Sequence, residues 1–213
     1  MRPVIACWLL GIAILAGGAW IVCPNGQCGM TEADRIGLTW AHALRSSMLD
    51  PLMHAATWLG SLKLLLPTFL VGTWLVCLRG GRREAVFLAT ALLGSAALSH
   101  LAKLWVARPR PELYAASVVM PEDWSYPSAH TMQVTAAGLA LVLASRRPHR
   151  GLALLLVTIV LLVSLSRIYL QVHFPSDVIA GMLAAACWVV GLFMLMFGRI
   201  QPGKDSNNGN ITR

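Results

Sequence analysis

Charged residues are scarce in this sequence. They make up 12% of its 213 residues, against about 25% in an ordinary water-soluble domain. Hydrophobic residues make up 57%, so a soluble globule of this size would have too little polar surface to cover its core. Disorder is excluded by the same figures, because disordered chains are poor in apolar residues. The 18 glycines and 11 prolines show no period, which excludes a collagen-like chain.

Acidic residues are the scarcest charged class. There are nine of them against 17 Lys and Arg, which gives a formal net charge of +8. In a soluble protein such a surplus would indicate nucleic-acid binding. The mean hydropathy of +0.66 indicates an integral membrane protein instead, in which Lys and Arg collect on cytoplasmic loops. We therefore expect a lipid bilayer around this chain and no nucleic acid partner.

Six segments are long and apolar enough to cross a bilayer, which takes about 20 residues of helix. They are Val4–Cys23, Leu62–Leu78, Glu84–Val106, Ala129–Ser145, Gly151–Leu170 and Asp177–Phe197. The sequence thus predicts an all-α, polytopic membrane fold with six transmembrane helices, in a single domain over residues 1–213. A signal peptide is the alternative for the first segment, although its apolar run is long for one and five more spans follow.

The basic residues between the segments predict the orientation. Four regions on one side of a six-span chain hold Arg2, Arg79, Arg82, Arg83, Arg146, Arg147, Arg150, Arg199, Lys204 and Arg213. Only two acids, Glu84 and Asp205, lie there, so these regions carry the whole surplus of +8. The positive-inside rule places this side and both termini in the cytoplasm. In a bacterium the other side faces the periplasm, and the end of the chain, Gly203–Arg213, is predicted to be a flexible polar tail.

The first outer connection contains an amphipathic stretch, Thr31–Leu49. Thr31 suits an N-cap, and Glu32 and Asp34 give an acidic first turn, both typical of a helix start. We expect a helix that lies on the outer surface of the membrane.

The five cysteines fall into two groups. Cys7, Cys77 and Cys187 lie inside apolar segments, where cysteine usually packs as a small hydrophobic residue. Cys23 and Cys28 flank a short turn on the outer side, where an oxidising compartment permits a disulfide. Two free thiols are the alternative. A metal site is not expected there, because two cysteines without a neighbouring histidine give too few ligands.

Ionisable residues near the outer ends of the last four segments form three clusters. Such residues are costly at membrane depth and are usually functional. The first cluster combines Lys103, Arg108 and Arg110 with Pro109 and Pro111. A helix end with positive charge and proline breakers explains this composition without a function. The alternative is an anion site, since lysine and arginine in fixed geometry bind phosphate.

The second cluster, Pro127-Ser128-Ala129-His130, stands where the fourth segment begins. Ser128 is a natural N-cap, so the backbone N–H groups after it point outward and form a ready anion site. A simple cap beside an interfacial histidine is the alternative.

The third cluster runs from Ser166-Arg167 to His173 and Asp177. Arg167 alone could extend its charge to the membrane interface. A carboxylate four residues after a histidine, however, can accept the ring N–H and stabilise an imidazolium, and a histidine held in this way can act as a nucleophile. Together the three clusters predict a phosphoryl-transfer site that works by charge stabilisation.

These motifs resemble, in order, the signature of the type 2 phosphatidic acid phosphatase (PAP2) superfamily. Its pattern is Lys-x6-Arg-Pro, then Pro-Ser-Gly-His, then Ser-Arg-x5-His-x3-Asp, which here spans residues 103–177. The six-span layout resembles the membrane branch of that family. Ala129 departs from the pattern, because the family usually has Gly there. The Lys-x6 spacing selects Arg110 as the motif arginine and leaves Arg108 as the second candidate.

The resemblance implies a role for each matching residue. His173 would attack phosphorus and form a phosphohistidine, and Asp177 would orient and charge-stabilise it. His130 would protonate the leaving oxygen and then activate water. The phosphate oxygens would be held by Lys103, Arg110, Arg167, Ser128 and the N–H groups near Ala129. No metal and no cofactor is implied.

The expected function is a metal-independent lipid phosphate or diphosphate phosphatase in a bacterial inner membrane, with its site facing the periplasm. Undecaprenyl diphosphate is the leading substrate, followed by phosphatidylglycerol phosphate, phosphatidic acid and lipid A phosphates. A lipid-to-lipid phosphotransferase with the same phosphohistidine is the first alternative. A non-catalytic protein that binds or transports lipid phosphate is the second. The sequence leaves the oligomeric state open.

Overall fold

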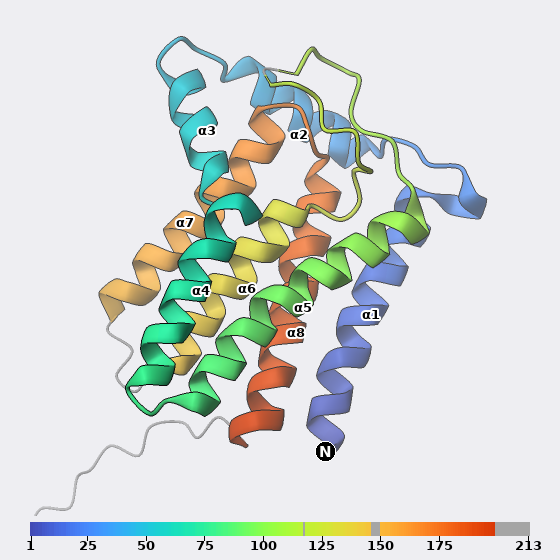
Figure 1. Ribbon diagram of the computed structural model, residues 1–213. Coiled ribbons are helices and arrows are strands. Elements are labelled where there is room, and N and C mark those ends of the chain that lie inside the picture. Colours follow the sequence, from blue (N-terminus) through green and yellow to red (C-terminus); the bar gives the residue numbers. More distant parts are fainter. Residues whose placement is uncertain (117, 146–149, 199–213) are drawn as a thin grey trace, which may run out of the picture.

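The computed structural model describes residues 1–116, 118–145 and 150–198, and Figure 1 shows a bundle of long helices with a cap of shorter ones. The polar tail and five predicted cytoplasmic cations, Arg146, Arg147, Arg199, Lys204 and Arg213, lie outside this part. Helices and no strands occur in the described part. They are α1 (Arg2–Val22), α2 (Glu32–Ala43), α3 (Leu49–Trp58), α4 (Leu62–Leu78), α5 (Arg82–Val106), α6 (Ala129–Ala144), α7 (Arg150–Tyr169) and α8 (Pro175–Phe197), with a 3₁₀ turn at Pro24–Gly26.

All six predicted apolar segments are helices, with ends within two residues of the expected ones. Four of them, α1, α5, α7 and α8, are long and apolar enough to cross a membrane, and α3 with α4 forms a bent pair that passes the same test as one span. The sixth, α6, is a shorter apolar helix. The chain is therefore a multi-pass membrane protein, while the number of six spans and the orientation of the termini stay predictions.

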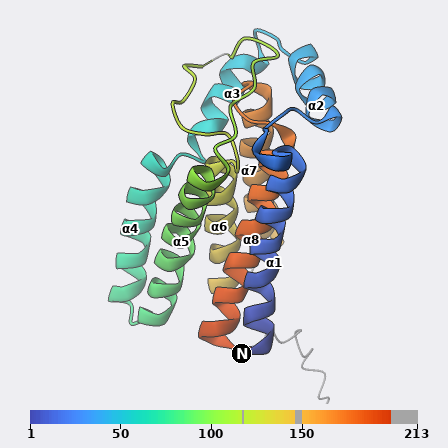
Figure 2. The same cartoon turned by 90° about the vertical axis from the view of Figure 1, so that its right-hand side faces the viewer.

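α6 occupies the middle of the bundle, in contact with α4, α5, α7 and α8, while α1 packs along α8. Figure 2 shows this arrangement from the side, with α4 and α5 at one edge and α1 beside α8. The main core joins Phe87 and Leu92 of α5, Met132 of α6, and Ala185 and Val189 of α8. Small residues on α6 and α8 allow this close approach, as is common between helices in membranes.

The helix expected in the stretch Thr31–Leu49 exists but is shorter, and its place on the outer surface of the membrane stays a prediction. A capping box at Thr31 and Asp34 starts α2, which ends at Ala43. A second helix, α3, follows after a short turn and was not predicted; it packs against α7. Leu38 and Ala41 of α2 are buried against the bundle, and so is Asp34 in its first turn.

Cys23 and Cys28 form a disulfide, so of the two alternatives left by the sequence the structure has the bridge. The bridge closes the turn that follows α1. Cys7, Cys77 and Cys187 are free and lie on α1, α4 and α8.

Tight packing of α1 on α8 gives a first prediction. A Cβ placed at Gly191 would lie 2.4 Å from Trp8 Nε1, so Gly191→Ala must displace that indole, at a cost of about 1–3 kcal/mol. Thermal unfolding of the detergent-solubilised protein should show a lower Tm. Gly17→Ala is the matched control, since none of the described atoms lies within 4 Å of a Cβ there. An equal Tm for the two variants would contradict the α1–α8 contact.

The disulfide gives a second prediction. Alkylation of the unfolded, unreduced protein should label three cysteines, and labelling after reduction should reach all five, because two thiols are held in the bridge. Mass spectrometry counts the labels directly. Five labels without reduction, in protein isolated from a periplasm-containing host, would show that the bridge does not form.

Candidate active site

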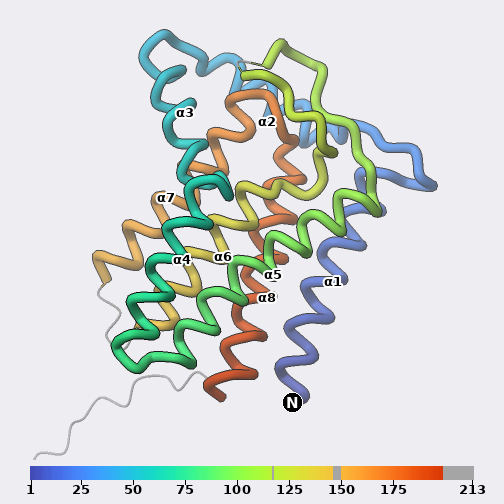
Figure 3. The backbone as a smooth tube through the Cα atoms, in the orientation of Figure 1, coloured from blue at the N-terminus to red at the C-terminus, as the bar shows by residue number. Residues whose placement is uncertain are grey.

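The predicted site residues gather at one end of the bundle. α5 and α7 end there, while α6 and α8 begin there, and the α5–α6 loop covers them; the tube in Figure 3 shows this loop folding back over the helix ends. The N-terminus and the α4–α5 turn lie at the opposite end in Figure 1. The two ends of the bundle are therefore chemically different, and the phosphate signature is confined to one of them.

His173 lies in the short loop between α7 and α8, and its ring is 1% exposed. Its Nδ1 is 3.5 Å from Oδ2 of Asp177, in the first turn of α8. Ser125 lies beside both groups, with its hydroxyl 3.4 Å from Nδ1 and donating a hydrogen bond to the same Asp177 oxygen. The Nδ1 side of the ring is thus directed at a buried carboxylate, as the i, i+4 spacing predicted.

The opposite nitrogen of His173 faces a cation. Nε2 is 3.3 Å from Nη1 of Arg110, and the same Nη1 donates to the carbonyl of Val172 at 2.6 Å. Arg110 therefore lies where a phosphate attacked by Nε2 would need positive charge. The Lys-x6 spacing selected this arginine; the structure places it beside His173, whereas Arg108 points to Asp177 and Asp34.

Lys103 and Arg110 share a carboxylate that the sequence analysis did not single out. Asp123 Oδ2 is 3.1 Å from Lys103 Nζ, its Oδ1 pairs with Arg110 Nη2, and its carbonyl accepts from Arg110 Nε at 2.8 Å. Burial alone would raise the pKa of Asp123, but the charges of Lys103 and Arg110 outweigh this and lower the pKa below its ordinary value. A carboxylate thus bridges two of the three predicted phosphate-binding cations.

Arg167 is the least compensated of these cations. It lies near the end of α7, is 4% exposed, and donates through Nη1 to the hydroxyl of Thr57 on α3. Its buried Nε has no hydrogen-bond partner among the described residues. Buried donors are normally satisfied, so Arg167 keeps a donor that an anion could satisfy.

His130 lies in the first turn of α6. The charges of Arg167, Arg110 and Lys103 all act on its ring. Ser128 is the N-cap residue, as predicted, but its hydroxyl accepts a bond from Thr131 at 3.1 Å rather than capping the helix amides. Ser128 N–H donates to the carbonyl of Asp177 at 3.1 Å, so the amides available to an anion at this helix start are those from Ala129 onward.

Electrostatics favour the neutral form of the His173 ring. Burial, together with the charges of Arg110, Arg167 and Lys103, lowers the pKa of His173 well below its ordinary value. The ring is therefore unprotonated at neutral pH, which is the form that can act as a nucleophile.

Four residues that contact the predicted site residues or Arg108 were not expected from the sequence: Asp34, Thr57, Asp123 and Ser125. Asp34 and Thr57 are far from the motifs along the chain, and only the fold brings them close. Asp123 and Ser125 had a usable signal, since they stand just before the motif that begins at Pro127. The loop that holds them lies between the first and second motifs, so its polar side chains could have been considered as further site residues.

The sequence model of the PAP2 superfamily matches residues 84–201, more than half of the chain. The chain belongs to the PAP2 superfamily. All eight candidate site residues lie inside the matched segment, at the end of the bundle described above: Lys103, Arg110, Ser128, Ala129, His130, Arg167, His173 and Asp177. Their catalytic roles stay predictions.

Two relatives that the chain matches are named as phosphatases of polyprenyl-linked phosphates. The chain is 37% identical over 107 residues to a decaprenylphosphoryl-5-phosphoribose phosphatase of Mycobacterium tuberculosis, which covers 49% of this chain and 57% of that protein. It is 31% identical over 112 residues to an undecaprenyl-diphosphatase of Sulfolobus acidocaldarius, covering 51% and 52%. The matches thus span little more than half the length of these relatives.

Solved PAP2 structures resemble the fold more completely. The crystal structure of a transmembrane PAP2 phosphatidylglycerolphosphate phosphatase from Bacillus subtilis superposes with a TM-score of 0.69 at 25% identity, over 93% of this chain and 96% of that one. The LpxE structure from Aquifex aeolicus gives a TM-score of 0.59 at 25% identity, over 73% and 92%.

The Asp123 bridge gives a third prediction. Inorganic phosphate must compete with this carboxylate for Lys103 and Arg110, so Asp123→Asn should bind phosphate about fivefold more tightly, the size expected for half-exposed ion pairs. The measurement is the dependence of Tm on phosphate concentration, which reports binding without any turnover. Glu122→Gln, at the neighbouring exposed acid, should match the wild type. Weaker phosphate binding by Asp123→Asn would show that Asp123 holds the cations in place.

Proposed function

We propose that this PAP2 protein is a lipid phosphate phosphatase that works through a phosphohistidine at His173. The observation that carries the proposal is the His173 ring, with one nitrogen directed at Asp177 and the other at Arg110. A nucleophile, its orienting carboxylate and a phosphate-binding cation are thereby aligned through one imidazole.

In the first step Nε2 of His173 attacks phosphorus and the bond to the leaving oxygen breaks. His130 gives that oxygen a proton, and the His173 ring, now positive, is stabilised by Asp177. In the second step water attacks the phosphohistidine, His130 takes its proton, and the N–P bond breaks to release inorganic phosphate. Lys103, Arg110 and Arg167 stabilise the oxygen charges in both steps.

The substrate is a lipid whose phosphate or diphosphate reaches the end of the bundle while its tail stays in the bilayer. The site lies at the end away from the described cations Arg2, Arg79, Arg82 and Arg83, which supports a periplasmic location in a bacterial inner membrane. Undecaprenyl diphosphate is our leading substrate, and the two polyprenyl-linked relatives support it. Phosphatidylglycerol phosphate, phosphatidic acid and lipid A phosphates are the other members of the test panel.

The fourth prediction tests catalysis. Purified protein in detergent should release phosphate from at least one lipid of this panel, with or without EDTA, and His173→Ala should lower the rate by at least about 1,000-fold, as expected for loss of a nucleophile. His42→Ala removes an exposed outer histidine and is the matched control.

Three outcomes contradict the proposal. Activity lost in EDTA and restored by Mg²⁺ would require a metal mechanism. An unchanged rate for His173→Ala would exclude the phosphohistidine. Label that moves from one lipid to another, with none released as phosphate, would identify a phosphotransferase.

A further inference from the structure

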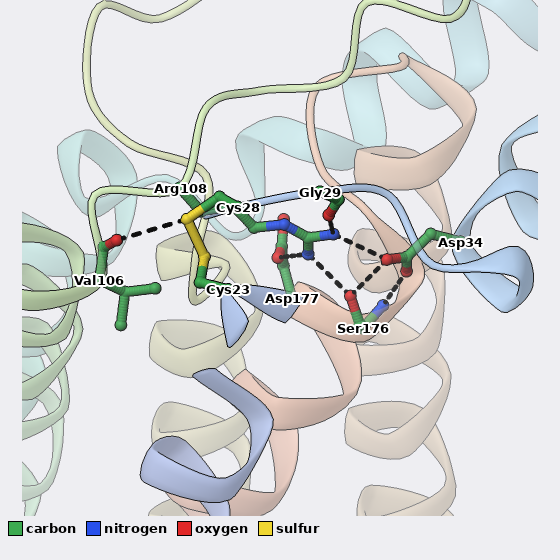
Figure 4. The surroundings of a disulfide bond; sticks show 8 residues. All are labelled: Cys23, Cys28, Gly29, Asp34, Val106, Arg108, Ser176 and Asp177. Carbon is green, nitrogen blue, oxygen red and sulfur yellow. Dashed lines mark hydrogen bonds and ion pairs between the residues drawn. A yellow bond between two sulfur atoms is a disulfide. The ribbon is translucent and has the colours of Figure 1, made fainter. Parts of the chain in front are cut away.

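Arg108 is a fully buried arginine at a position that the Lys-x6-Arg-Pro motif leaves unspecified. It follows α5 by two residues, after Ala107 turns the chain with a positive φ of 51°. Figure 4 shows its guanidinium between two carboxylates, Asp177 of α8 and Asp34 of α2. The side chain therefore joins the outer helix to the catalytic end of the bundle.

We propose that Arg108 is a positioning residue: it fixes the carboxylate of Asp177 toward His173 and is itself held in place by Asp34. This inference rests on the proposed function, in which Asp177 orients the nucleophile.

The four terminal N–H groups of Arg108 are all taken by acceptors of the protein, while its Nε is buried without a hydrogen-bond partner among the described residues. Nη1 donates to Asp177 Oδ1 at 2.6 Å and to the Ser176 hydroxyl at 2.8 Å. Nη2 donates to Asp34 Oδ2 at 2.8 Å and to the carbonyl of Gly29 at 2.7 Å. Both terminal nitrogens thus have two acceptors each and no hydrogen left for a substrate. Arg110, by contrast, faces His173.

The contacts of Asp177 explain what Arg108 positions. Oδ1 accepts from Arg108, while Oδ2 accepts from the Ser125 hydroxyl and from the Phe174 N–H, the latter at 3.0 Å. Both oxygens are engaged, so the carboxylate cannot rotate without breaking a charged hydrogen bond. The oxygen that is not bound to Arg108 is the one that faces His173 Nδ1.

Charge balance gives Arg108 a second effect. Asp34, Arg108 and Asp177 together carry a net charge of −1, which the imidazolium formed at His173 would neutralise. Without Arg108 two carboxylates would be buried with no cation between them, and a carboxyl in that situation takes up a proton. Asp34 has the complementary effect, because it takes part of the Arg108 charge that would otherwise be directed wholly at Asp177.

The outer segment holds Arg108 in this position. Asp34 accepts from the Ser176 N–H at 2.9 Å and from the Ser176 hydroxyl at 3.0 Å, which ties α2 to the start of α8. Burial would raise the pKa of Asp34, but the bonds from Arg108 and Ser176 outweigh it and lower the pKa. Gly29, whose carbonyl accepts from Arg108, directly follows the disulfide loop. The guanidinium lies 3.7 Å from the ring centroid of Phe174, a favourable cation–π distance.

The test compares Arg108→Gln, Arg108→Lys and Asp34→Asn in the full-length protein in detergent, with the panel lipid that the wild type hydrolyses. Arg108→Gln should lower kcat about 100-fold with KM unchanged, the scale expected when a catalytic group is misplaced. Arg108→Lys keeps the positive charge but loses the planar guanidinium that pairs with both carboxylates, so its kcat should lie between those of Arg108→Gln and the wild type. Asp34→Asn should lower kcat by about tenfold with KM unchanged. Arg35→Gln breaks an exposed pair with Glu32 on α2 and is the control with wild-type kinetics.

The pH profile separates positioning from a structural role. Asp177 is surrounded by Arg108 and His173, with Lys103 and Tyr126 within electrostatic range and Asp34 behind Arg108. In Arg108→Gln the acidic limb of kcat should move up by about one pH unit, because a carboxylate that loses its cation is protonated at higher pH. A variant that is merely less stable would lose activity without moving this limb.

Each result decides the proposal. Wild-type kcat in Arg108→Gln, or a raised KM with kcat unchanged, would overturn it. If Arg108→Gln does not fold, as judged by size exclusion and Tm, Arg108→Lys decides. A lowered kcat at constant KM supports the positioning role of the Arg108 guanidinium, and a wild-type kcat overturns it. Failure of the proposed function would appear separately, as a wild type that releases no phosphate from any panel lipid.

Discussion

The arrangement of this end of the protein depends on one buried cation between two buried carboxylates. Arg108 pairs with Asp34 at 2.8 Å and with Asp177 at 2.6 Å, and all three side chains are at most 1% exposed. Removing one partner from such a set is expensive, because it leaves a buried charge without compensation. The guanidinium therefore links α2, the loop after α5 and the start of α8, in addition to the bonds between Asp34 and Ser176.

A second group of cations at the same end of the bundle is compensated differently. In the described part of the chain, Lys103, Arg110 and Arg167 have one carboxylate among them, that of Asp123, whose side chain is 54% exposed. The charge of Arg108 is paired with two buried carboxylates, whereas the charges of these three cations are paired only in part, with a carboxylate at the surface. Positive charge that the protein itself neutralises incompletely attracts an anion, and a phosphate has the charge and the number of acceptors to satisfy three cations at once.

The helices and the positions of the motif residues could both be predicted from the sequence, but for different physical reasons. Hydropathy identifies apolar helices because the bilayer requires every backbone group to be paired within the segment, and the motif spacing identifies Arg110 and His173 because both lie within one or two turns of a helix end. Asp34 and Arg108 pair across 74 positions of the chain, which no local pattern encodes. α3 was missed because the amphipathic stretch before it hid the break after Ala43. The sequence did not decide between a disulfide and two free thiols, because a short spacing between cysteines permits the bridge without requiring it.

Asp177 serves the fold and the proposed chemistry with the same atoms. Its Oδ2 accepts the Phe174 N–H at the start of α8, a bond of the kind that stabilises a helix start, and it is also the oxygen nearest His173. A substitution at Asp177 therefore mixes loss of the helix start with loss of the orienting carboxylate. Arg108 contacts the other oxygen, Oδ1, and Asp34 contacts Arg108. Substitutions at these two positions therefore change the charge and orientation of the Asp177 carboxylate while its bond to Phe174 remains. α2 is not among the helices that are long and apolar enough to cross a membrane, so it supplies Asp34 without a carboxylate inside a spanning segment, where its insertion would be costly.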